Sequence, residues 1–335
     1  MRYLNLTMKV LFILFVMYGF SIAEELNKTF TGIRSINIET TSGDCIIKAG
    51  TTNEVVVHMI SEVVPQGAFR PEVRQSGDRL NIEEEWRGSS SGRVKWTLTV
   101  PEEITIDFST ASGDLSVNIP KTYLEAKTAS GDITVENTDG EMELKTASGE
   151  VSLEDVTGET IEIKTASGEV TLKSVTGDIQ ISTASGDVTG RNLEGDIQIG
   201  TASGEIDLNG LKGSLEFSCA SGDITLSEVI LERSASFSTA SGDVKVSLAK
   251  SAAYDIKMSA ASGDVRLDYN GNEITGYFEF TARKRSGTIS SPFDFDNIEE
   301  FDKHGQTYEL KSFTRAKDSP RIYLNTASGS AILKK

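Results

Sequence analysis

The most repetitive polar feature of the chain is an acidic residue that follows a glycine at nearly regular intervals. If the strands that carry these acids stack, their side chains form one column about 4.8 Å apart, and adjacent charges repel by roughly 0.9 kcal/mol even in bulk water. A divalent cation such as calcium could bridge adjacent carboxylates. The nine candidate metal ligands are Asp114, Asp132, Glu150, Glu169, Asp187, Glu205, Asp223, Asp243 and Asp264.

The same acids have a second interpretation that involves no metal. Asp and Ser beside glycine are ordinary turn residues, whose oxygens accept hydrogen bonds from free backbone amides while the side chain faces water. Calcium-binding β-rolls share half of the period found here, but their repeated double-glycine and Gly-x-Asp pattern is absent from this chain. The sequence therefore favours turn chemistry and no cofactor, with calcium as the open alternative.

Each acid closes a repeated phrase, Thr-Ala-Ser-Gly-Asp/Glu, which first occurs at residues 110–114. The threonine is replaced twice, by Cys219 and by Ala260. The hydroxyls could form a regular surface for glycan or crystalline ligands. Alternatively, Thr and Ser bond along a stacked sheet while Ala points inward, and this interpretation is favoured because cross-strand Thr and Ser pairs commonly stabilise sheets.

Residues with the chemistry of polysaccharide cleavage are few. Such enzymes need two carboxylates at a set separation. Stretches 137–140, 304–305 and 321–322 are similar to short polygalacturonase motifs, but the Asp expected to pair with Asp139 is missing and His304 falls in an irregular loop. The sequence shows no Ser/His/Asp set, no Cys/His metal spacing and no phosphate-binding loop. It therefore predicts no catalytic residues, with a polysaccharide-active β-helix enzyme (lyase or glycoside hydrolase) as the alternative.

The elements that position these residues follow from the spacing of the phrase. Its glycines recur at nearly constant intervals, which predicts a stacked repeat; they lie at positions 113, 131, 149, 168, 186, 204, 222, 242 and 263. A weaker glycine phrase recurs halfway between the strong ones, as at Gly177 between Gly168 and Gly186. We expect two half-turns per repeat, each a glycine corner at φ > 0 followed by a short strand.

Apolar residues alternate with polar ones after each corner, as in Val170, Thr171, Leu172 and Lys173. Period-two alternation predicts half-buried strands rather than helices. The fold expected is all-β: a single-chain, right-handed parallel β-solenoid (β-helix) with about 18 residues per coil and divergent β caps at both ends. The eight intervals between the nine glycines would span on the order of 40 Å.

Four segments are expected. Residues 1–23 are typical of a secretory signal peptide, with Lys9, an apolar run from Val10 to Phe20, and Ala23 at the cleavage point. That run is too short to span a bilayer, so we expect a mature chain without a transmembrane span, in the periplasm or at the cell surface. Residues 24–109 form a divergent β region and cap, residues 110–270 the regular repeats, and residues 271–335 a second cap.

The second cap is expected to close the core with aromatic side chains and to contain a last echo of the phrase at residues 326–329. The clustered aromatics are Phe278, Phe280, Phe293, Phe295 and Phe301.

Charge and cysteine content restrict the partners and the redox chemistry. The formal net charge is −17, and loss of residues 1–23 would make it −19, which argues against nucleic acid and anionic membrane surfaces as partners. Cys45 and Cys219 are the only cysteines. Each fits a small buried strand residue, so we expect two free thiols, although export would permit a disulfide.

The repeated phrase, the leader, the strand-rich N-terminal part and the closing echo together resemble a bacterial family, the putative adhesin family of exported β-strand-repeat proteins, a domain of unknown function. The resemblance covers roughly residues 30–335 and implies a β-solenoid in the cell envelope. No catalytic residues carry over. The function expected is that of an acidic, non-enzymatic adhesin or envelope binding scaffold, with a glycan or protein as its ligand.

Overall fold

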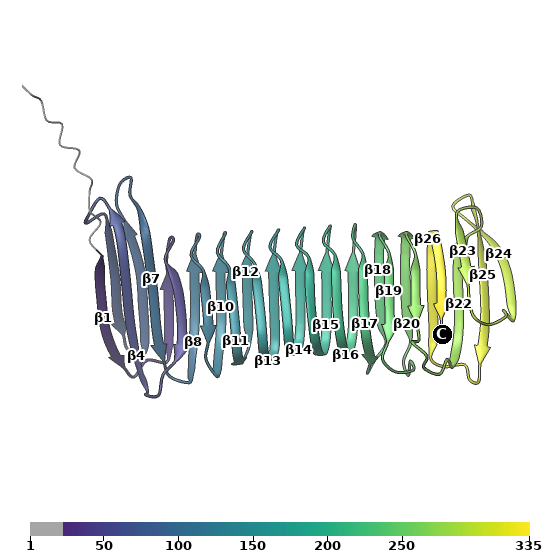
Figure 1. Ribbon diagram of the computed structural model, residues 1–335, viewed down its shortest axis with the longest axis horizontal. Helices are drawn as coiled ribbons and strands as arrows, with labels where there is room; N and C mark the ends of the chain where they lie inside the picture. The colour runs from purple at the N-terminus through teal and green to yellow at the C-terminus, as the bar shows by residue number, and fades with distance from the viewer. Residues whose placement is uncertain (1–22) are drawn as a thin grey trace, which may run out of the picture.

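The computed structural model describes residues 23–335, so the predicted signal peptide lies outside the described residues except for Ala23. Within this range the chain contains no helix and folds as 26 strands in one long mixed sheet, which confirms the all-β prediction. Figure 1 shows an elongated molecule in which a regular stack of strands separates two thicker ends.

The regular stack consists of strands that pair in parallel with their counterparts one repeat away. Val151 pairs with Val170, and Val170 with Val188, so equivalent residues of successive repeats lie side by side. Each repeat contributes one strand segment to each of two faces. The strands are β8 (Glu103–Thr110), β9 (Leu115–Asn118), β10 (Lys121–Thr128), β11 (Ile133–Asp139), β12 (Met142–Thr146), β13 (Val151–Thr165), β14 (Val170–Thr183), β15 (Val188–Thr201), β16 (Ile206–Cys219), β17 (Ile224–Leu231), β18 (Ala235–Ser241), β19 (Val244–Leu248), β20 (Ile256–Ser262) and β21 (Val265–Asp268).

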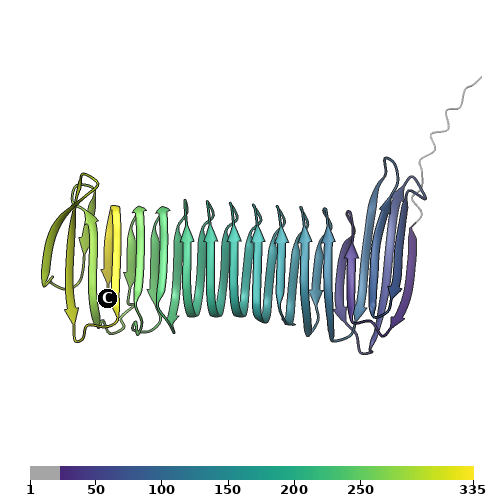
Figure 2. The same ribbon diagram turned by 180° about the vertical axis from the view of Figure 1, so that it is seen from behind.

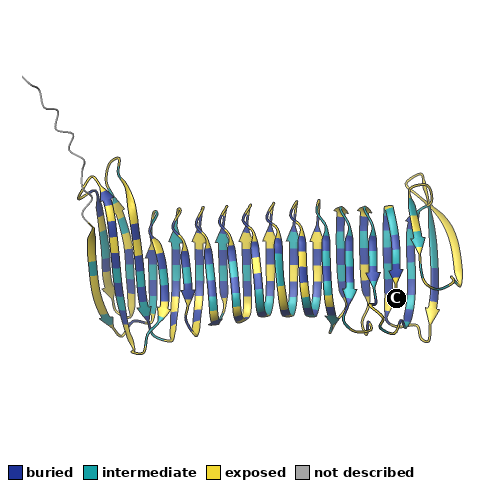
Figure 3. Cartoon of the chain, viewed as in Figure 1, coloured by how far each residue is buried: buried dark blue, intermediate teal, exposed yellow. Residues whose placement is uncertain are grey.

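The core lies between the two faces and runs the length of the stack. Along each strand buried and exposed residues alternate, which is visible as bands in Figure 3. Ile179 and Val170 are fully buried, whereas Thr171 is exposed, as the alternation predicts. The apolar side chains of neighbouring repeats therefore pack on one another in columns, and each repeat buries its inner face only because the next one covers it.

The glycine of the strong phrase has a different role from the one predicted. Gly186 is not at positive φ; instead, a Cβ atom on it would lie 1.9 Å from the carbonyl oxygen of Gly168 in the layer before. The same close approach continues from Gly113, which lies against Gly43, to Gly329, which lies against Gly263. Glycine is needed here because two backbones pack together, so the φ > 0 argument for Gly186 was wrong. Only the last three phrase glycines, Gly242, Gly263 and Gly329, have positive φ.

Within the stack, positive φ occurs mainly at the second corner of each repeat, at the edge opposite the phrase glycines. Two positions of this bend are affected. Most second-corner glycines have φ between 130° and 148° (Gly140, Gly177, Gly195 and Gly213). Three residues earlier each repeat places one left-handed residue, which the sequence analysis did not identify. These residues are Asn137, Asp155, Ser174, Asn192, Gly210 and Glu228, with φ between 51° and 71°.

The N-terminal end contains a layer that is separated from its neighbour by a long insertion. Strands β2 (Ser35–Glu39) and β3 (Asp44–Ala49) pair in parallel with β8 and β9, although several other strands lie between them in the chain. The intervening chain forms the cap, whose strands β6 and β7 cover the other side of β2 and β3. The cap strands are β1 (Glu24–Thr31), β4 (Glu54–Val64), β5 (Phe69–Ser76), β6 (Arg79–Trp86) and β7 (Ser91–Val100).

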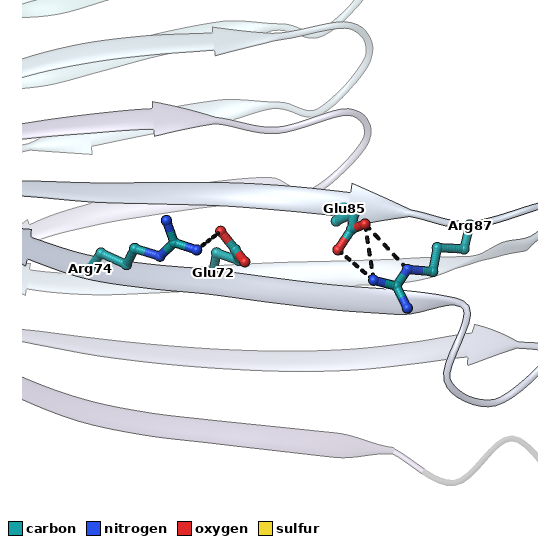
Figure 4. A network of polar contacts seen from close by, with 4 residues as sticks. All are labelled: Glu72, Arg74, Glu85 and Arg87. Atoms are coloured by element: carbon teal, nitrogen blue, oxygen red, sulfur yellow. Dashed lines mark hydrogen bonds and ion pairs between the residues drawn. The ribbon is translucent and has the colours of Figure 1, made fainter.

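In the stack, turn N–H groups donate to backbone carbonyls of the preceding repeat. At the first layer the side chain of Glu84, in the N-terminal cap, is the acceptor instead. Its carboxylate accepts the backbone N–H of Thr41, at 2.9 Å, and the indole N–H groups of Trp96 and Trp86, at 2.8 and 3.1 Å. Trp96 itself is fully buried and closes the core. On the neighbouring β5–β6 hairpin, the pairs Glu72–Arg74 and Glu85–Arg87 lie on the surface (Figure 4).

The C-terminal end repeats this arrangement in reverse. Strand β26 (Arg321–Lys334), which carries the closing echo, pairs with β20 and β21 on one side and with β22 and β23 on the other. The echo is therefore an inner layer rather than the end of the stack (Figures 1 and 2). The cap strands outside it are β22 (Gly276–Arg283), β23 (Gly287–Ser290), β24 (Asn297–Lys303) and β25 (Gln306–Arg315).

Aromatic side chains close this end of the core, as predicted, with one exception. Phe278 and Phe280 are fully buried, and Phe293 and Phe295 pack against them and Phe313. Phe301 was included in the predicted cluster, but it is 39% exposed and stacks on Tyr308 at the outside of the cap. Its strand, β24, lies at the sheet edge and pairs only with β25, so nothing covers it.

Both cysteines are free and buried, as predicted. Cys45 lies in β3 and Cys219 at the end of β16. Burial, with the nearby carboxylates of Glu84 and Asp44, raises the pKa of the Cys45 thiol far above its usual range. Both side chains therefore act as small apolar residues rather than as nucleophiles.

Candidate functional site

The predicted acid column exists, and its aspartates bond to the backbone of the next layer. The Oδ1 atom of Asp132 accepts the N–H of Glu150 at 2.8 Å, and Asp114 accepts the N–H of Asp132 at 2.9 Å. The same contact is made by Asp44, Asp187, Asp223, Asp243 and Asp264. Among the described residues, the column positions occupied by Glu150, Glu169 and Glu205 make no such bond.

The acids do not converge. Within residues 23–335 no group of three or more His, Cys, Asp and Glu side chains is arranged to hold a metal ion. Each layer contributes one acid to the column. The aspartates of the column accept hydrogen bonds from backbone N–H groups of the adjacent turn. The geometry therefore supports the turn interpretation for the aspartates, and calcium binding stays a prediction.

Asp243 shows how its neighbours stabilise such a carboxylate in its charged form. Partial burial acts to raise the pKa of Asp243, but the N–H of Asp264 and the ammonium of Lys245 outweigh it and lower the pKa. The Lys245 nitrogen lies 2.9 Å from the Asp243 carboxylate, and this hydrogen bond raises the pKa of Lys245 in turn. Local protein groups thus already provide the positive charge that a cation would offer.

The threonine hydroxyls of the phrase are internal, whereas its serines are exposed. In six repeats the threonine Oγ1 accepts the N–H of the phrase glycine three residues later, as Thr183 does from Gly186 at 2.8 Å. Thr183 is buried, whereas Ala184 is exposed at the turn, so the expectation that Ala points inward was wrong. The threonines are therefore not available as a ligand surface. The other equivalent bonds are made by Thr110, Thr128, Thr146, Thr165 and Thr201.

One cleft interrupts the regular surface near the N-terminal end of the stack. It has a volume of about 700 Å³ and extends across the ends of β8, β10 and β11 and the bend within β13. We call it the Tyr123 groove. Its lining residues are Arg34, Glu103, Ile104, Thr105, Lys121, Thr122, Tyr123, Asp139, Gly140, Glu141 and Glu159.

Departures from the repeat shape this groove. The register of β13 and β14 shifts between Gly158 and Thr160, so Glu159 is the extra residue of a β-bulge and accounts for the one longer interval among the neighbouring phrase glycines. Tyr123 is 45% exposed and occupies a position that holds Thr105 in the preceding layer. Bulges commonly re-aim side chains beside functional sites. The signals of this groove in the sequence are the longer glycine interval and a lone tyrosine in a polar column.

The groove mixes hydrogen-bond donors with acceptors. The ammonium of Lys121 lies 3.0 Å from the carboxylate of Glu103, and Arg34 adds a second cation. Asp139, Glu141 and Glu159 contribute further carboxylates, and all of them are exposed. Two cations and four acids beside one aromatic ring suit a neutral polar ligand better than an anion.

The structure separates the residues that resembled polygalacturonase motifs. Asp139 ends β11 in the N-terminal part of the stack, whereas His304 lies in the turn between β24 and β25 at the opposite end of the molecule (Figure 1). Arg321 begins β26, in the layer beneath the C-terminal cap. Only Asp139 lies in the Tyr123 groove, so these residues do not form one site.

The described residues therefore form an all-β stack with one continuous glycine column and two caps. The chain belongs to the Toastrack DUF4097 family, a domain of unknown function, whose model matches residues 33–199 and 189–277. This confirms the resemblance to a family of β-strand-repeat proteins whose shared domain has no known function. A search of curated proteins found no match.

Two solved structures are similar over nearly their full lengths. A protein from Clostridium sporogenes described as a putative cell adhesion protein is 11% identical, with a TM-score of 0.21, over 93% of this chain and 99% of that one. A putative lipid binding protein from Parabacteroides distasonis is 14% identical, with a TM-score of 0.31, over 92% and 96%. These scores are too low for either described role to bear on this chain. Among the described residues, no helix has the length and hydropathy of a membrane span.

Proposed function

We propose that the protein is an exported, acidic, non-enzymatic adhesin or cell-envelope scaffold that binds a saccharide in the Tyr123 groove. In this proposal the stack is a right-handed parallel β-solenoid with one repeat per coil, and it needs no cofactor. The observation that carries the proposal is the groove itself. Glu159, at the β-bulge, and the exposed Tyr123 line it and interrupt the regular surface of the repeats.

The lining of the groove matches the chemistry of a sugar ring. The face of a pyranose presents C–H groups that pack on an aromatic ring, and its rim presents hydroxyls that both donate and accept hydrogen bonds. Tyr123 offers the ring, the carboxylates of Asp139 and Glu159 accept, and Lys121 donates. A volume of about 700 Å³ is within the usual range for a small-ligand site.

The remainder of the stack suits a spacer rather than a second site. Its buried phrase threonines and its column aspartates already bond to the backbone of their own or adjacent layers, and its inward-facing aliphatic residues are buried. Groups that are saturated internally have little capacity left for ligands. The stack would then hold the groove at a fixed distance from the C-terminal end.

The test is a glycan-binding screen of the mature chain, with Tyr123→Ala as the site variant. Tyr254→Ala is the matched control, since Tyr254 is 42% exposed and lies outside the groove. We expect binding to a defined glycan that weakens roughly tenfold or more in Tyr123→Ala and is unchanged in the control. Equal loss in both variants, or no glycan bound by the mature chain, would contradict the proposal.

A polysaccharide-active enzyme is the second candidate, because four carboxylates line the same groove. A general acid must hold its proton near neutral pH, which usually requires an apolar, water-poor setting. Glu103, Asp139, Glu141 and Glu159 are all exposed, and this favours binding over cleavage. Release of reducing or unsaturated ends by the purified protein, abolished in Asp139→Asn, would establish the enzyme instead.

A further inference from the structure

The C-terminal cap contains a second cleft whose charge is opposite to that of the molecule as a whole. It has a volume of about 560 Å³ and lies between the turn that follows β22 and the hairpin turn that joins β24 to β25. Its lining residues are Arg283, Lys284, Arg285, Glu300, Gly305, Gln306 and Thr307. We call it the basic cleft.

Three consecutive cations in this cleft contrast with the rest of the chain. The full sequence carries a formal charge of −17, yet Arg283, Lys284 and Arg285 adjoin one another with no acid between them. Exposed charges farther than about 8 Å are largely screened at physiological ionic strength. The local surplus of positive charge, rather than the net charge of the molecule, therefore determines what approaches this cleft.

The backbone holds these cations in place. The N–H of Lys284 donates to the carbonyl of Thr307 at 3.0 Å, and the Ser286 hydroxyl donates to the carbonyl of Ala327 at 3.1 Å. The Arg283 guanidinium lies 5.9 Å from the centre of the Tyr308 ring, which in turn stacks on Phe301. Arginine stacked on an aromatic ring loses less side-chain freedom when it binds a ligand.

Much of the hydrogen-bonding capacity of the cations is unused. Glu300, the only acid that lines the cleft, pairs with Lys284. Within residues 23–335, Arg285 forms no ion pair and the buried Nε of Arg283 has no hydrogen-bond partner. The Arg285 guanidinium is therefore free to bind the oxygens of an anionic ligand.

We propose that the basic cleft binds the anionic groups of an acidic saccharide. Two guanidinium groups and an ammonium on one rigid turn match carboxylate or similar oxyanions, which arginine binds through two parallel hydrogen bonds. The cleft can hold one or a few sugar rings, given its volume. It is independent of the Tyr123 groove, which lies near the other end of the stack and suits a neutral ligand.

The acids of β24 argue against an anionic membrane as the occupant. Glu299, Glu300 and Asp302 lie on the exposed outermost strand, beside the basic cleft. A flat anionic bilayer would have to approach these acids together with the cations, whereas a thin polymer chain can enter the cleft alone. Repulsion between like charges therefore selects a slender ligand.

The test is the binding of labelled polygalacturonate oligomers to the mature chain, compared with their neutral methyl esters. We expect binding of the acid form only, and its weakening as salt rises from about 50 to about 200 mM, because cations on the protein displace counterions from the polymer. Lys284→Gln/Arg285→Gln should raise Kd roughly tenfold or more, and Arg285→Gln alone should raise it severalfold. Arg285→Gln keeps the test valid if the double variant disturbs the cap.

Two control variants, the methyl ester and anionic lipid vesicles make the result specific. Lys127→Gln/Lys164→Gln removes the same charge from the regular stack and should leave Kd unchanged, as should Tyr123→Ala. Equal weakening by the stack variant, or equal binding of the methyl ester, would overturn the proposal. Sedimentation with anionic lipid vesicles but no binding of the oligomers would also overturn it, in favour of a lipid headgroup.

Discussion

The regular stack and the two caps are stabilised by different side chains, although both consist of β-strands. In the stack, glycine permits contact between layers, threonine and aspartate bond to adjacent amides, and side chains as large as Trp are absent from residues 110–270. In the caps, aromatic side chains fill the ends of the core, and the Glu84 carboxylate accepts the turn N–H of Thr41. Repetition provides the length of the stack, and irregular residues provide its ends.

The comparison also indicates where a ligand can bind. Both clefts lie where the repeat is disturbed, one at the Glu159 bulge and one at the Arg283–Arg285 turn. A repeat that satisfies its own polar groups offers no distinctive surface, whereas a departure from the repeat leaves groups free. The predictions below test this contrast between saturated repeats and irregular positions.

The largest expected effect is at the glycine column of the stack. Gly186→Val would place a Cβ atom 1.9 Å from the Gly168 carbonyl oxygen, so two layers must separate, and we expect a loss of more than about 4 kcal/mol in the free energy of unfolding. Gly88 in the N-terminal cap has φ 65° with no neighbour within 4 Å. Gly88→Asn should cost less than about 1 kcal/mol, because Asn tolerates that φ. Urea denaturation measures both, and equal losses would refute the close-contact role.

The second-largest loss of stability is expected from a charge placed in the continuous core. Ile179→Asp would bury an unpaired carboxylate in a fully buried position, and we expect a loss of about 4 kcal/mol. Thr171→Asp on the outer face should cost less than about 1 kcal/mol. Hydrogen exchange should show lost protection in layers on both sides of Ile179 while β4 and β7 of the cap stay protected. Similar damage from both substitutions would contradict the strand register.

A smaller effect is expected at the buried threonines. Thr183→Val keeps the shape of the side chain but leaves the Gly186 N–H without its acceptor, at a cost of about 1–2 kcal/mol. Thr171→Val on the exposed face is the control and should change the free energy of unfolding by less than about 0.5 kcal/mol. Chemical denaturation of both variants would show whether the phrase needs its hydroxyl for the backbone.

At the left-handed position of the bend, one substitution is expected to increase stability. Ser174 has φ 54°, which Asn tolerates better, and Asn137 and Asn192 already occupy the equivalent positions. Ser174→Asn should raise the free energy of unfolding by about 0.5 kcal/mol, and Asn192→Ser should lower it by a similar amount. Changes of the same sign in both variants would contradict a conformational origin.

The smallest expected effect concerns the acid column. Calcium should raise the melting temperature modestly more than sodium at matched ionic strength, because a bridging ion binds only the folded column. The chain should stay folded in chelator, since the aspartates bond to backbone amides. Equal shifts with both salts would leave the acids as turn residues alone. Unfolding in chelator would identify them as required metal ligands.

Periodicity made the stack predictable, because one pattern repeated nine times specifies strands, core and corners. It could not distinguish a glycine that needs positive φ from one that needs contact, since both produce a constant glycine; Gly186 was assigned the wrong reason. The left-handed column was missed because Asn, Asp, Ser, Gly and Glu share no side-chain chemistry, only a tolerated φ. Tyr123 with the longer glycine interval, and the run Arg283–Arg285, are local signals of the two clefts, but the walls of each cleft come from other layers of the stack or cap, which the sequence pattern does not place.

The placement of β2–β3 and β26 inside the stack affects how the molecule would respond to mechanical force. Each lies between two layers, and its partners are distant in the chain, since Ile36 pairs with Ile106 and Ile256 with Ile322. A pull on the C-terminus therefore acts on a strand that is hydrogen-bonded on both sides, so bonds to two layers must break before this strand leaves the stack. Because β2–β3 and β26 each bond to a cap on one side and to the stack on the other, detachment of either terminal layer would disrupt more backbone hydrogen bonds than detachment of an outermost strand.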